Sequence, residues 1–132
     1  MTDPRPRAPA PRPPRLTAAE TEPFVTLDGS TIRELMHPNR DLCAAQSLAQ
    51  ARVAPGARTI RHRHHRTEEL YHLLAGEGLM FLDDTAFAVG PGDTVAIAPG
   101  RDHCIENTGS VPLVFLCCCA PAYSDEDTEL LE

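Results

Sequence analysis

Apolar and polar residues alternate in short runs along the central part of the chain, and turn residues separate these runs. An alternation with a period of two is typical of half-buried β-strands. The expected strands are Ser47–Val53, Glu69–Leu74, Leu79–Leu82, Ala86–Val89, Thr94–Ile97, His103–Asn107 and Leu113–Cys119. Regular short strands between Gly, Pro and Asp turns predict an all-β sandwich or barrel.

No long helical period accompanies these strands. Residues Thr31–Met36 fit either a strand or one helical turn. The longest apolar stretch, Val111–Ala122, contains Pro112 and Pro121 and is too short to span a bilayer. No charged and then apolar leader opens the chain, so we expect no membrane partner and no secretion.

The two ends of the chain differ from its centre in composition. Residues 1–20 are rich in Pro and Arg, which predicts a disordered tail. Residues 124–132 are acidic, which predicts a surface tail. The 132 residues suit one folded domain, which we place at residues 21–123.

Charge and cysteine content exclude several function classes. The formal net charge of -7 argues against nucleic acid as the partner. All basic side chains other than histidine belong to arginine, so lysine Schiff-base chemistry is excluded for this chain. The cysteines are odd in number and three are consecutive, which suits a reduced cytoplasmic setting better than a disulfide framework.

Histidines supply the candidate chemistry. His62 and His64 share one face of a strand, Glu69 follows at the start of the next strand, and His103 begins a later one. Three imidazoles and one carboxylate suit one divalent transition metal ion such as Fe, Mn, Zn, Cu or Ni. On its own, the run Arg61–Arg66 also fits a solvated basic surface.

The residues around the histidines favour the metal. Gly56, His62, His64, Glu69 and Gly76 stand at the spacing Gly-x5-His-x-His-x4-Glu-x6-Gly, which is similar to the first motif of the cupin superfamily. A second group of spaced residues resembles the second motif of that family: Gly92, Pro99, Gly100, His103 and Asn107. This chain has Ala98-Pro99-Gly100 where the family commonly has Pro-Pro-Gly or Pro-x-Gly. The resemblance covers about residues 44–120.

This resemblance implies an antiparallel jelly-roll β-barrel, the cupin fold, with a metal inside one mouth. The ligands that it implies are His62, His64, Glu69 and His103, with Glu69 on a strand adjacent to the two histidines and His103 on a facing strand. Asn107 is then structural. Glu68 is the alternative carboxylate, since the family motif tolerates three or four residues after the second histidine.

Several other side chains are candidates for a functional role. Tyr71 faces the same way as Glu69, so both are candidate catalytic residues, although Tyr71 also fits a barrel-lining aromatic. His65 and His72 should face outward. For Cys117, Cys118 and Cys119 we expect packing of the last strand, because three consecutive thiols cannot all face one ion. Cys104 should face away from the metal.

Taken together, the sequence predicts a mononuclear metal-dependent enzyme of the cupin type. Its substrate would be a small polar or carboxylate-bearing molecule, and a dioxygenase-like oxidoreductase is the first choice. A non-redox decarboxylase, lyase, cyclase, isomerase or natural-product bond-forming enzyme is the alternative, as is a non-catalytic ligand-binding cupin. Exposed sheet edges and an apolar barrel face further predict a homodimer.

Overall fold

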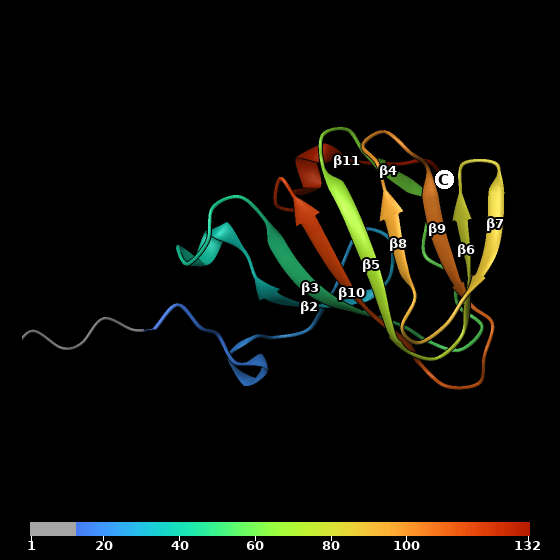
Figure 1. Ribbon diagram of the computed structural model, residues 1–132, viewed down its shortest axis with the longest axis horizontal. Coiled ribbons are helices and arrows are strands. Elements are labelled where there is room, and N and C mark those ends of the chain that lie inside the picture. Colours follow the sequence, from blue (N-terminus) through green and yellow to red (C-terminus); the bar gives the residue numbers. More distant parts are fainter. Residues whose placement is uncertain (1–12) are drawn as a thin grey trace, which may run out of the picture.

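The computed structural model describes residues 13–132, so residues 1–12 of the expected tail lie outside the described residues. The described residues form β-strands joined by turns and three short 3-10 helices (Figure 1). The strands are β1 (Phe24–Val25), β2 (Thr31–Met36), β3 (Ser47–Val53), β4 (His62–His64), β5 (Glu68–Ala75), β6 (Gly78–Leu82), β7 (Thr85–Val89), β8 (Thr94–Ile97), β9 (His103–Asn107), β10 (Leu113–Ala120) and β11 (Thr128–Leu130). The helices are η1 (Ala18–Glu20), η2 (Pro38–Arg40) and η3 (Asp125–Asp127).

The strands build two antiparallel sheets that face each other, which confirms the all-β antiparallel prediction. The larger sheet has the order β1-β2-β3-β10-β5-β8, and the smaller sheet has the order β11-β4-β9-β6-β7. All seven strands expected from the alternation are present, and their bounds differ from the expected ones by at most one residue. Thr31–Met36, for which strand and helix were both open, is strand β2 and pairs with β3.

The core lies between the two sheets. It is built from the inward positions of strands whose residues alternate between buried and accessible, as on β5 and β10. The largest fully buried apolar side chains are Leu73, Met80, Ile97, Ile105, Leu113 and Phe115. Asn107 links the ends of several strands, because its amide donates to the carbonyls of Val53 and Val111 and its oxygen accepts from Gly109 N. This is the structural role that was expected for it.

One turn shows why glycine is required. Gly76 has a φ of +84°, and a Cβ added there would lie 2.7 Å from the carbonyl oxygen of Pro112. A side chain is therefore excluded both by the backbone conformation and by the neighbouring chain. The tight turn lets β5 pass into β6 and so cross from the larger sheet to the smaller one.

Both ends of the described chain depart from the expected division into tails and domain. Residues 124–132, expected to be a separate surface tail, form η3 and β11, and β11 pairs with β4. The expected N-terminal tail extended to residue 20, but Arg33 of β2 donates to the carbonyl oxygen of Ala18 at 2.8 Å. The sequence did not predict these contacts, because the charged and turn residues of a segment do not show whether it pairs with another strand.

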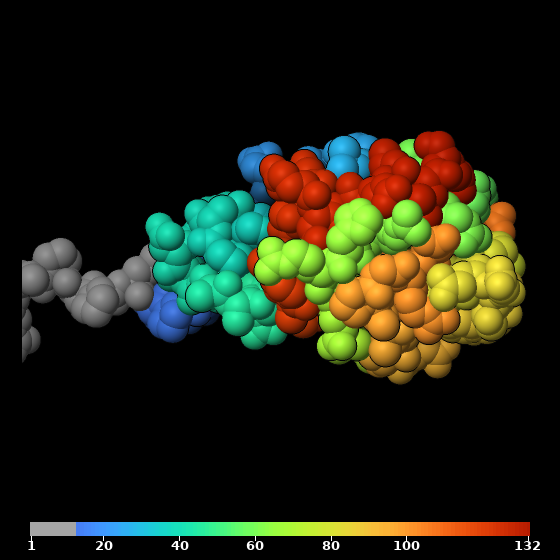
Figure 2. Space-filling model, turned by 90° about the horizontal axis from the view of Figure 1, so that it is seen from above, coloured from blue at the N-terminus to red at the C-terminus, as the bar shows by residue number. Residues whose placement is uncertain are grey.

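Figure 2 shows the C-terminal segment, in red, spread over the face seen from above, and part of the N-terminal segment, in blue, reaching the same face. Among the described residues, no helix has the length and apolar character needed to cross a membrane.

Candidate metal centre

The four residues of the expected ligand set come together inside the barrel. His62 and His64 lie on β4, and His103 is the first residue of β9, directly opposite His62 in the antiparallel pair. Glu69 comes from β5 in the other sheet. The expected placement of the strands was therefore wrong: His103 lies on the strand adjacent to β4, and Glu69 lies on the facing strand. The turn between β4 and β5 crosses from one sheet to the other, which spacing alone does not reveal.

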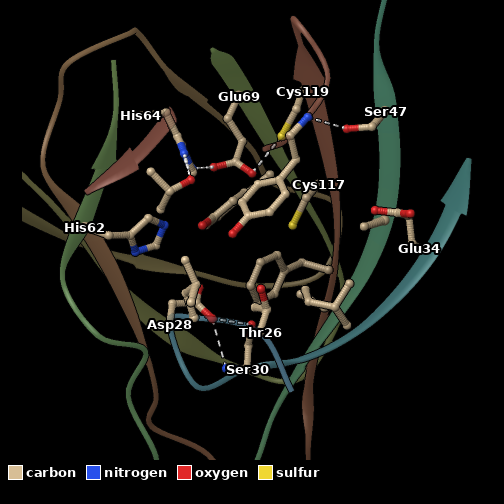
Figure 3. Close-up of a pocket in the computed structure, with 18 of the residues that line it drawn as sticks. Thr26, Asp28, Ser30, Glu34, Ser47, His62, His64, Glu69, Cys117 and Cys119 are labelled. Atoms are coloured by element: carbon tan, nitrogen blue, oxygen red, sulfur yellow. Dashed lines mark hydrogen bonds and ion pairs between the residues drawn. The ribbon is translucent and has the colours of Figure 1, made fainter. Parts of the chain in front are cut away.

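One atom from each of these residues contributes to a compact group. The four candidate ligand atoms all lie within 4.8 Å of one another, and all four residues are buried. Glu69 Oε1 lies 3.2 Å from Nε2 of His64 and 3.4 Å from Nε2 of His103. Figure 3 shows His62, His64 and Glu69 converging on one side of an internal cavity.

Two atoms of this group have no hydrogen-bond partner among the described residues. They are Glu69 Oε1 and His103 Nε2, and the side chains that carry them are 6% and 0% exposed. A buried polar atom without a partner is costly, so it indicates that something outside the polypeptide satisfies it. Imidazole nitrogens and a carboxylate oxygen are suitable donors for a divalent transition metal, so the residues present fit such an ion.

The outer nitrogen of each imidazole is held by another group. Nδ1 of His62 lies 2.8 Å from the carbonyl oxygen of Ile60, and Nδ1 of His103 lies 3.1 Å from that of Arg101. A carbonyl only accepts, so both Nδ1 atoms carry the proton and both Nε2 atoms keep a free lone pair. Nδ1 of His64 contacts the Thr128 hydroxyl at 2.9 Å, and that hydroxyl donates to the Ser124 carbonyl oxygen. His64 Nδ1 is therefore also a donor, and the three rings present unprotonated Nε2 atoms to the group.

The protonation states suit metal binding. Burial lowers the pKa of His62, and the neighbouring imidazole of His103 lowers it further, so the ring is neutral. Burial by itself would raise the pKa of Glu69, but the side chains of His103 and His64, when a proton rather than a metal occupies Nε2, act in the opposite direction and hold this pKa well below its usual value. Neutral imidazoles and an ionised carboxylate are the forms that ligate metals.

The consecutive cysteines divide between the two faces of β10. Cys117 and Cys119 are buried in the barrel, while Cys118 lies on the other face and is partly accessible. Cys119 Sγ donates to Glu69 Oε2 at 3.1 Å. Burial raises the pKa of Cys119, and the charge of Glu69 raises it further, so the thiol stays protonated. The group that holds the second oxygen of Glu69 is thus a thiol, which the packing prediction for this run did not include.

Tyr71 lies in the barrel interior beside the group, as its place two residues after Glu69 predicted. Its ring centroid is 5.9 Å from that of His103 and 4.6 Å from that of Phe115. Burial, and then the charge of Glu69, raise the pKa of the Tyr71 phenol well above its usual value. The phenol is therefore a neutral hydrogen-bond donor at the cavity wall.

The cavity beside the group has a volume of about 60 Å³. Since one water occupies about 10–15 Å³ on this measure, the space holds roughly four to six water-sized groups. Its wall includes Tyr71, and Figure 3 shows His62, His64 and Glu69 on one side and Thr26, Asp28 and Ser30 of the β1–β2 loop on the other. A ligand of a few heavy atoms fits this space.

The remaining candidates lie away from the group. His65 is exposed and pairs with Glu129, with 3.0 Å between Nε2 and Oε2. His72 contacts the Thr94 hydroxyl at 2.8 Å on the outer side of β5. Cys104 is buried and lies 3.4 Å from Arg58 Nη1. Glu68 is exposed on β5, so Glu69 is the carboxylate that joins the three histidines.

Two residues near the group were missed by sequence reasoning. Thr128 holds His64 and Asp28 lines the cavity, and both lie outside the two histidine motifs. Spacing could not find Thr128, because its contact depends on β11 folding back onto β4. Asp28 is one of several acidic residues in a turn-rich stretch, and nothing in the sequence distinguishes it from the others.

Comparison with known proteins gives consistent results. A family model described as "Cupin domain" matches residues 49–119, which include all four residues of the group. An uncharacterized protein of Methanocaldococcus jannaschii, MJ1618, is 53% identical over 111 residues, which are 84% of this chain and 89% of that protein. The oxalate-binding protein of Thermotoga maritima is 32% identical over 84 residues, 64% of this chain and 65% of that protein.

A solved structure agrees with these sequence matches. The crystal structure of a predicted oxalate decarboxylase from Thermotoga maritima superposes with a TM-score of 0.68 at 25% identity, covering 80% of this chain and 96% of that one. The shared barrel, the family match over more than half of the chain and the relative at 53% identity lead to one conclusion. This chain belongs to the cupin domain family.

Proposed function

We propose that the chain is a mononuclear metal-dependent cupin enzyme that acts on a small polar or carboxylate-bearing molecule. The observation that carries the proposal is the pair of unpartnered buried atoms, Glu69 Oε1 and His103 Nε2, in a group of which His62, His64 and Glu69 line an internal cavity. His62, His64, Glu69 and His103 would hold one divalent ion of Fe, Mn, Zn, Cu or Ni. Such an ion supplies Lewis acidity and, where it is redox-active, a path for electrons.

The chain's own residues would perform three tasks. The barrel keeps bulk water away from the site, since the cavity accommodates only a few small groups. Glu69 and Tyr71 are the proposed catalytic residues: Glu69 remains ionised, and the Tyr71 phenol keeps its proton and can donate a hydrogen bond to a ligand oxygen. Cys119 orients Glu69 by donating to its second oxygen.

Within this function, a dioxygenase-like oxidoreductase is the first choice. The alternative is non-redox chemistry such as decarboxylation, and the similarity to a predicted oxalate decarboxylase favours it as the second choice. Five free cysteines support a reducing compartment, so we place the enzyme in the cytoplasm. A non-catalytic ligand-binding role is less well supported, because all four residues of the ligand group are present and buried.

The choice of metal separates these reaction classes. The protein would be loaded with Fe²⁺, Mn²⁺ or Zn²⁺ in turn and assayed with a panel of small hydroxy, amino and carboxylic acids, recording dioxygen uptake and product formation. An oxidoreductase should turn over with Fe or Mn and consume dioxygen, whereas a lyase or decarboxylase should also work with Zn and consume none. Stoichiometric metal without turnover of any compound would favour the binding role.

The role of Glu69 has a matched control next to it in the chain. Glu69→Gln should keep the fold and still bind Zn detectably, because three imidazoles suit that ion, while Mn and Fe binding should weaken far more. Turnover should fall by about a hundredfold or more. The control is Glu68→Gln, which removes the same charge from an exposed position on the same strand. Equal metal affinity and turnover in the two variants would show that Glu69 is not a ligand.

A further inference from the structure

Acidic side chains also line the side of the cavity that lies opposite the proposed metal ligands. Thr26, Asp28 and Ser30 line it from the β1–β2 loop, and Glu34 lines it from β2 (Figure 3). Asp28 lines the same cavity as His62 and Tyr71. A ligand that reaches the unpartnered Oε1 of Glu69 through this cavity therefore also meets the wall that carries Asp28.

Asp28 is fixed in position before any ligand arrives. Its Oδ1 accepts hydrogen bonds from the backbone N and the hydroxyl of Ser30, at 2.9 and 2.6 Å. The backbone of Asp28 is held as well, because Ile60 N donates to its carbonyl oxygen at 2.8 Å. Both contacts keep the carboxylate at the cavity wall, with Oδ2 available to a ligand.

The charges around the cavity select against a dianion. Among the described lining residues, the side chains with a formal charge are Asp28, Glu34 and Glu69, and none is arginine. A divalent ion together with Glu69 leaves one positive charge, which one carboxylate of a ligand neutralises. A second carboxylate would face Asp28 and Glu34 in a poorly hydrated space, where like charges repel strongly.

We propose that the ligand of this cavity is a small zwitterion, with an oxygen donor directed to the metal group and an ammonium group directed to Asp28. The inference rests on the proposed metal-dependent function and narrows its substrate class. It also sets this chain apart from its relative named for oxalate binding, because a dicarboxylate lacks the cation that Asp28 would pair with. An ammonium–carboxylate pair inside a cavity satisfies both charges, so it contributes specificity.

Three probes of equal chain length test the proposal: β-alanine, 3-hydroxypropanoate and malonate. They share one carboxylate and differ at the other end, which carries an ammonium, a hydroxyl or a second carboxylate. Binding to zinc-loaded protein would be measured by calorimetry at pH 7, with the zinc content determined after each titration. We expect β-alanine to bind at least about tenfold more tightly than malonate, with 3-hydroxypropanoate between them.

Asp28→Asn tests the assigned residue. Asparagine keeps an oxygen for the Ser30 contacts, so the loop should stay folded while the charge is lost. The preference for β-alanine over malonate should then fall below about threefold, whereas Asp84→Asn at the exposed β6–β7 turn should leave it unchanged. Malonate binding as tightly as β-alanine, or a preference that persists in Asp28→Asn, overturns the proposal. Wild-type protein that takes up no metal overturns the proposed function instead.

Discussion

The N-terminal segment (residues 21–30) and the C-terminal segment (residues 124–132) both border the cavity, but different forces hold them. Each contributes a short edge strand, β1 to the larger sheet and β11 to the smaller one. β1 carries apolar side chains that stay accessible, with Phe24 48% and Val25 70% exposed. The C-terminal segment carries acidic side chains, and three of them, Asp127, Glu129 and Glu132, have partners between residues 58 and 67.

Those partners fasten the C-terminal segment to β4 and its flanks. The Asp127 carboxylate accepts from the backbone N atoms of Arg66 and Thr67 at 2.9 and 3.0 Å. Glu129 pairs with Arg63 at 2.9 Å, and Glu132 forms two contacts with Arg58 at 2.9 and 2.8 Å. Between these anchors, Thr128 contacts His64.

Because their contacts differ, the two segments should have different roles. The C-terminal segment touches a proposed metal ligand directly, so its position determines where His64 Nε2 points. The N-terminal segment contributes Asp28 and Thr26 to the cavity wall but contacts none of the four ligand residues through a hydrogen bond within the described chain. Changes in the C-terminal segment should therefore alter metal affinity, and changes in the N-terminal segment should alter what enters the cavity.

Deleting residues 124–132 should have the largest effect. The deletion removes the partner of His64 Nδ1 and exposes the edge of β4, so zinc affinity should fall by about a hundredfold or more. Affinity would be measured by competition with a chromophoric chelator, and circular dichroism would report whether the barrel persists. Undiminished affinity in a folded deletion variant would contradict the positioning role. If the deletion variant does not fold, the substitutions of Thr128 described next test the positioning role in its place.

A matched pair of threonine substitutions isolates the contact itself. Thr128→Val removes the hydroxyl at constant volume and should lower zinc affinity by about 10- to 100-fold, while Thr128→Ser should restore most of it. Thr26→Val makes the same change in the N-terminal segment and should leave affinity within about threefold. Equal losses in the two valine variants would mean that cavity polarity, rather than the hold on His64, controls the metal.

The exposed apolar side chains of the N-terminal segment favour the proposed homodimer. A second copy packed on β1 would cover Phe24, Val25 and Leu27, which are otherwise 41% exposed or more. Val25→Asp should shift the dimer toward monomer by about tenfold in dissociation constant and leave zinc content unchanged. Sedimentation velocity at tens of micromolar would measure this. Wild-type protein that sediments as a monomer at that concentration would refute the homodimer.

The sequence predicted the strands and the chemistry of the site, because both are local. Alternation gave the seven central strands, and the i, i+2 spacing put His62 and His64 on one face. The grouping of strands into sheets was not local. Glu69 was expected on the strand adjacent to β4 and His103 on a facing strand, but the structure has the reverse. The reason is that the turn before β5 crosses from one sheet to the other, and the spacing of residues does not predict that crossing.

The two segments were also beyond sequence reasoning, for a related reason. An acidic run such as residues 124–132 has the composition of a solvated tail unless its partners are known. Here the partners are arginines and backbone N–H groups about 60 to 75 residues earlier in the chain. Cys119 was recognised as a packing residue, but its hydrogen bond to Glu69 depends on the register between β10 and β5.

Acid should weaken the C-terminal anchors by a smaller amount and leave the backbone pairing of β1 with β2 unaffected. Burial by itself would raise the pKa of Asp127, but hydrogen bonds from the backbone N–H groups of Thr67 and Arg66 outweigh it, so the pKa lies below its usual value. A carboxyl group whose pKa is lowered on folding stabilises the protein above its unfolded pKa, about 3.9, and loses that contribution as the pH falls through its folded value.

Asp127→Asn should accordingly melt about 2–5 °C below wild type at pH 7, and this gap should narrow as the pH falls below about 4. Thermal scans at half-unit pH intervals would measure it. Asp84→Asn, at the exposed β6–β7 turn, is the charge-matched control and should show no pH-dependent gap. Strand β1 pairs with β2 through backbone hydrogen bonds, which do not titrate in this range, so Phe24→Ala should change the melting temperature equally at pH 7 and pH 3. A gap for Asp127→Asn that stays constant across this range would mean that the charge of Asp127 does not hold the C-terminal segment in place.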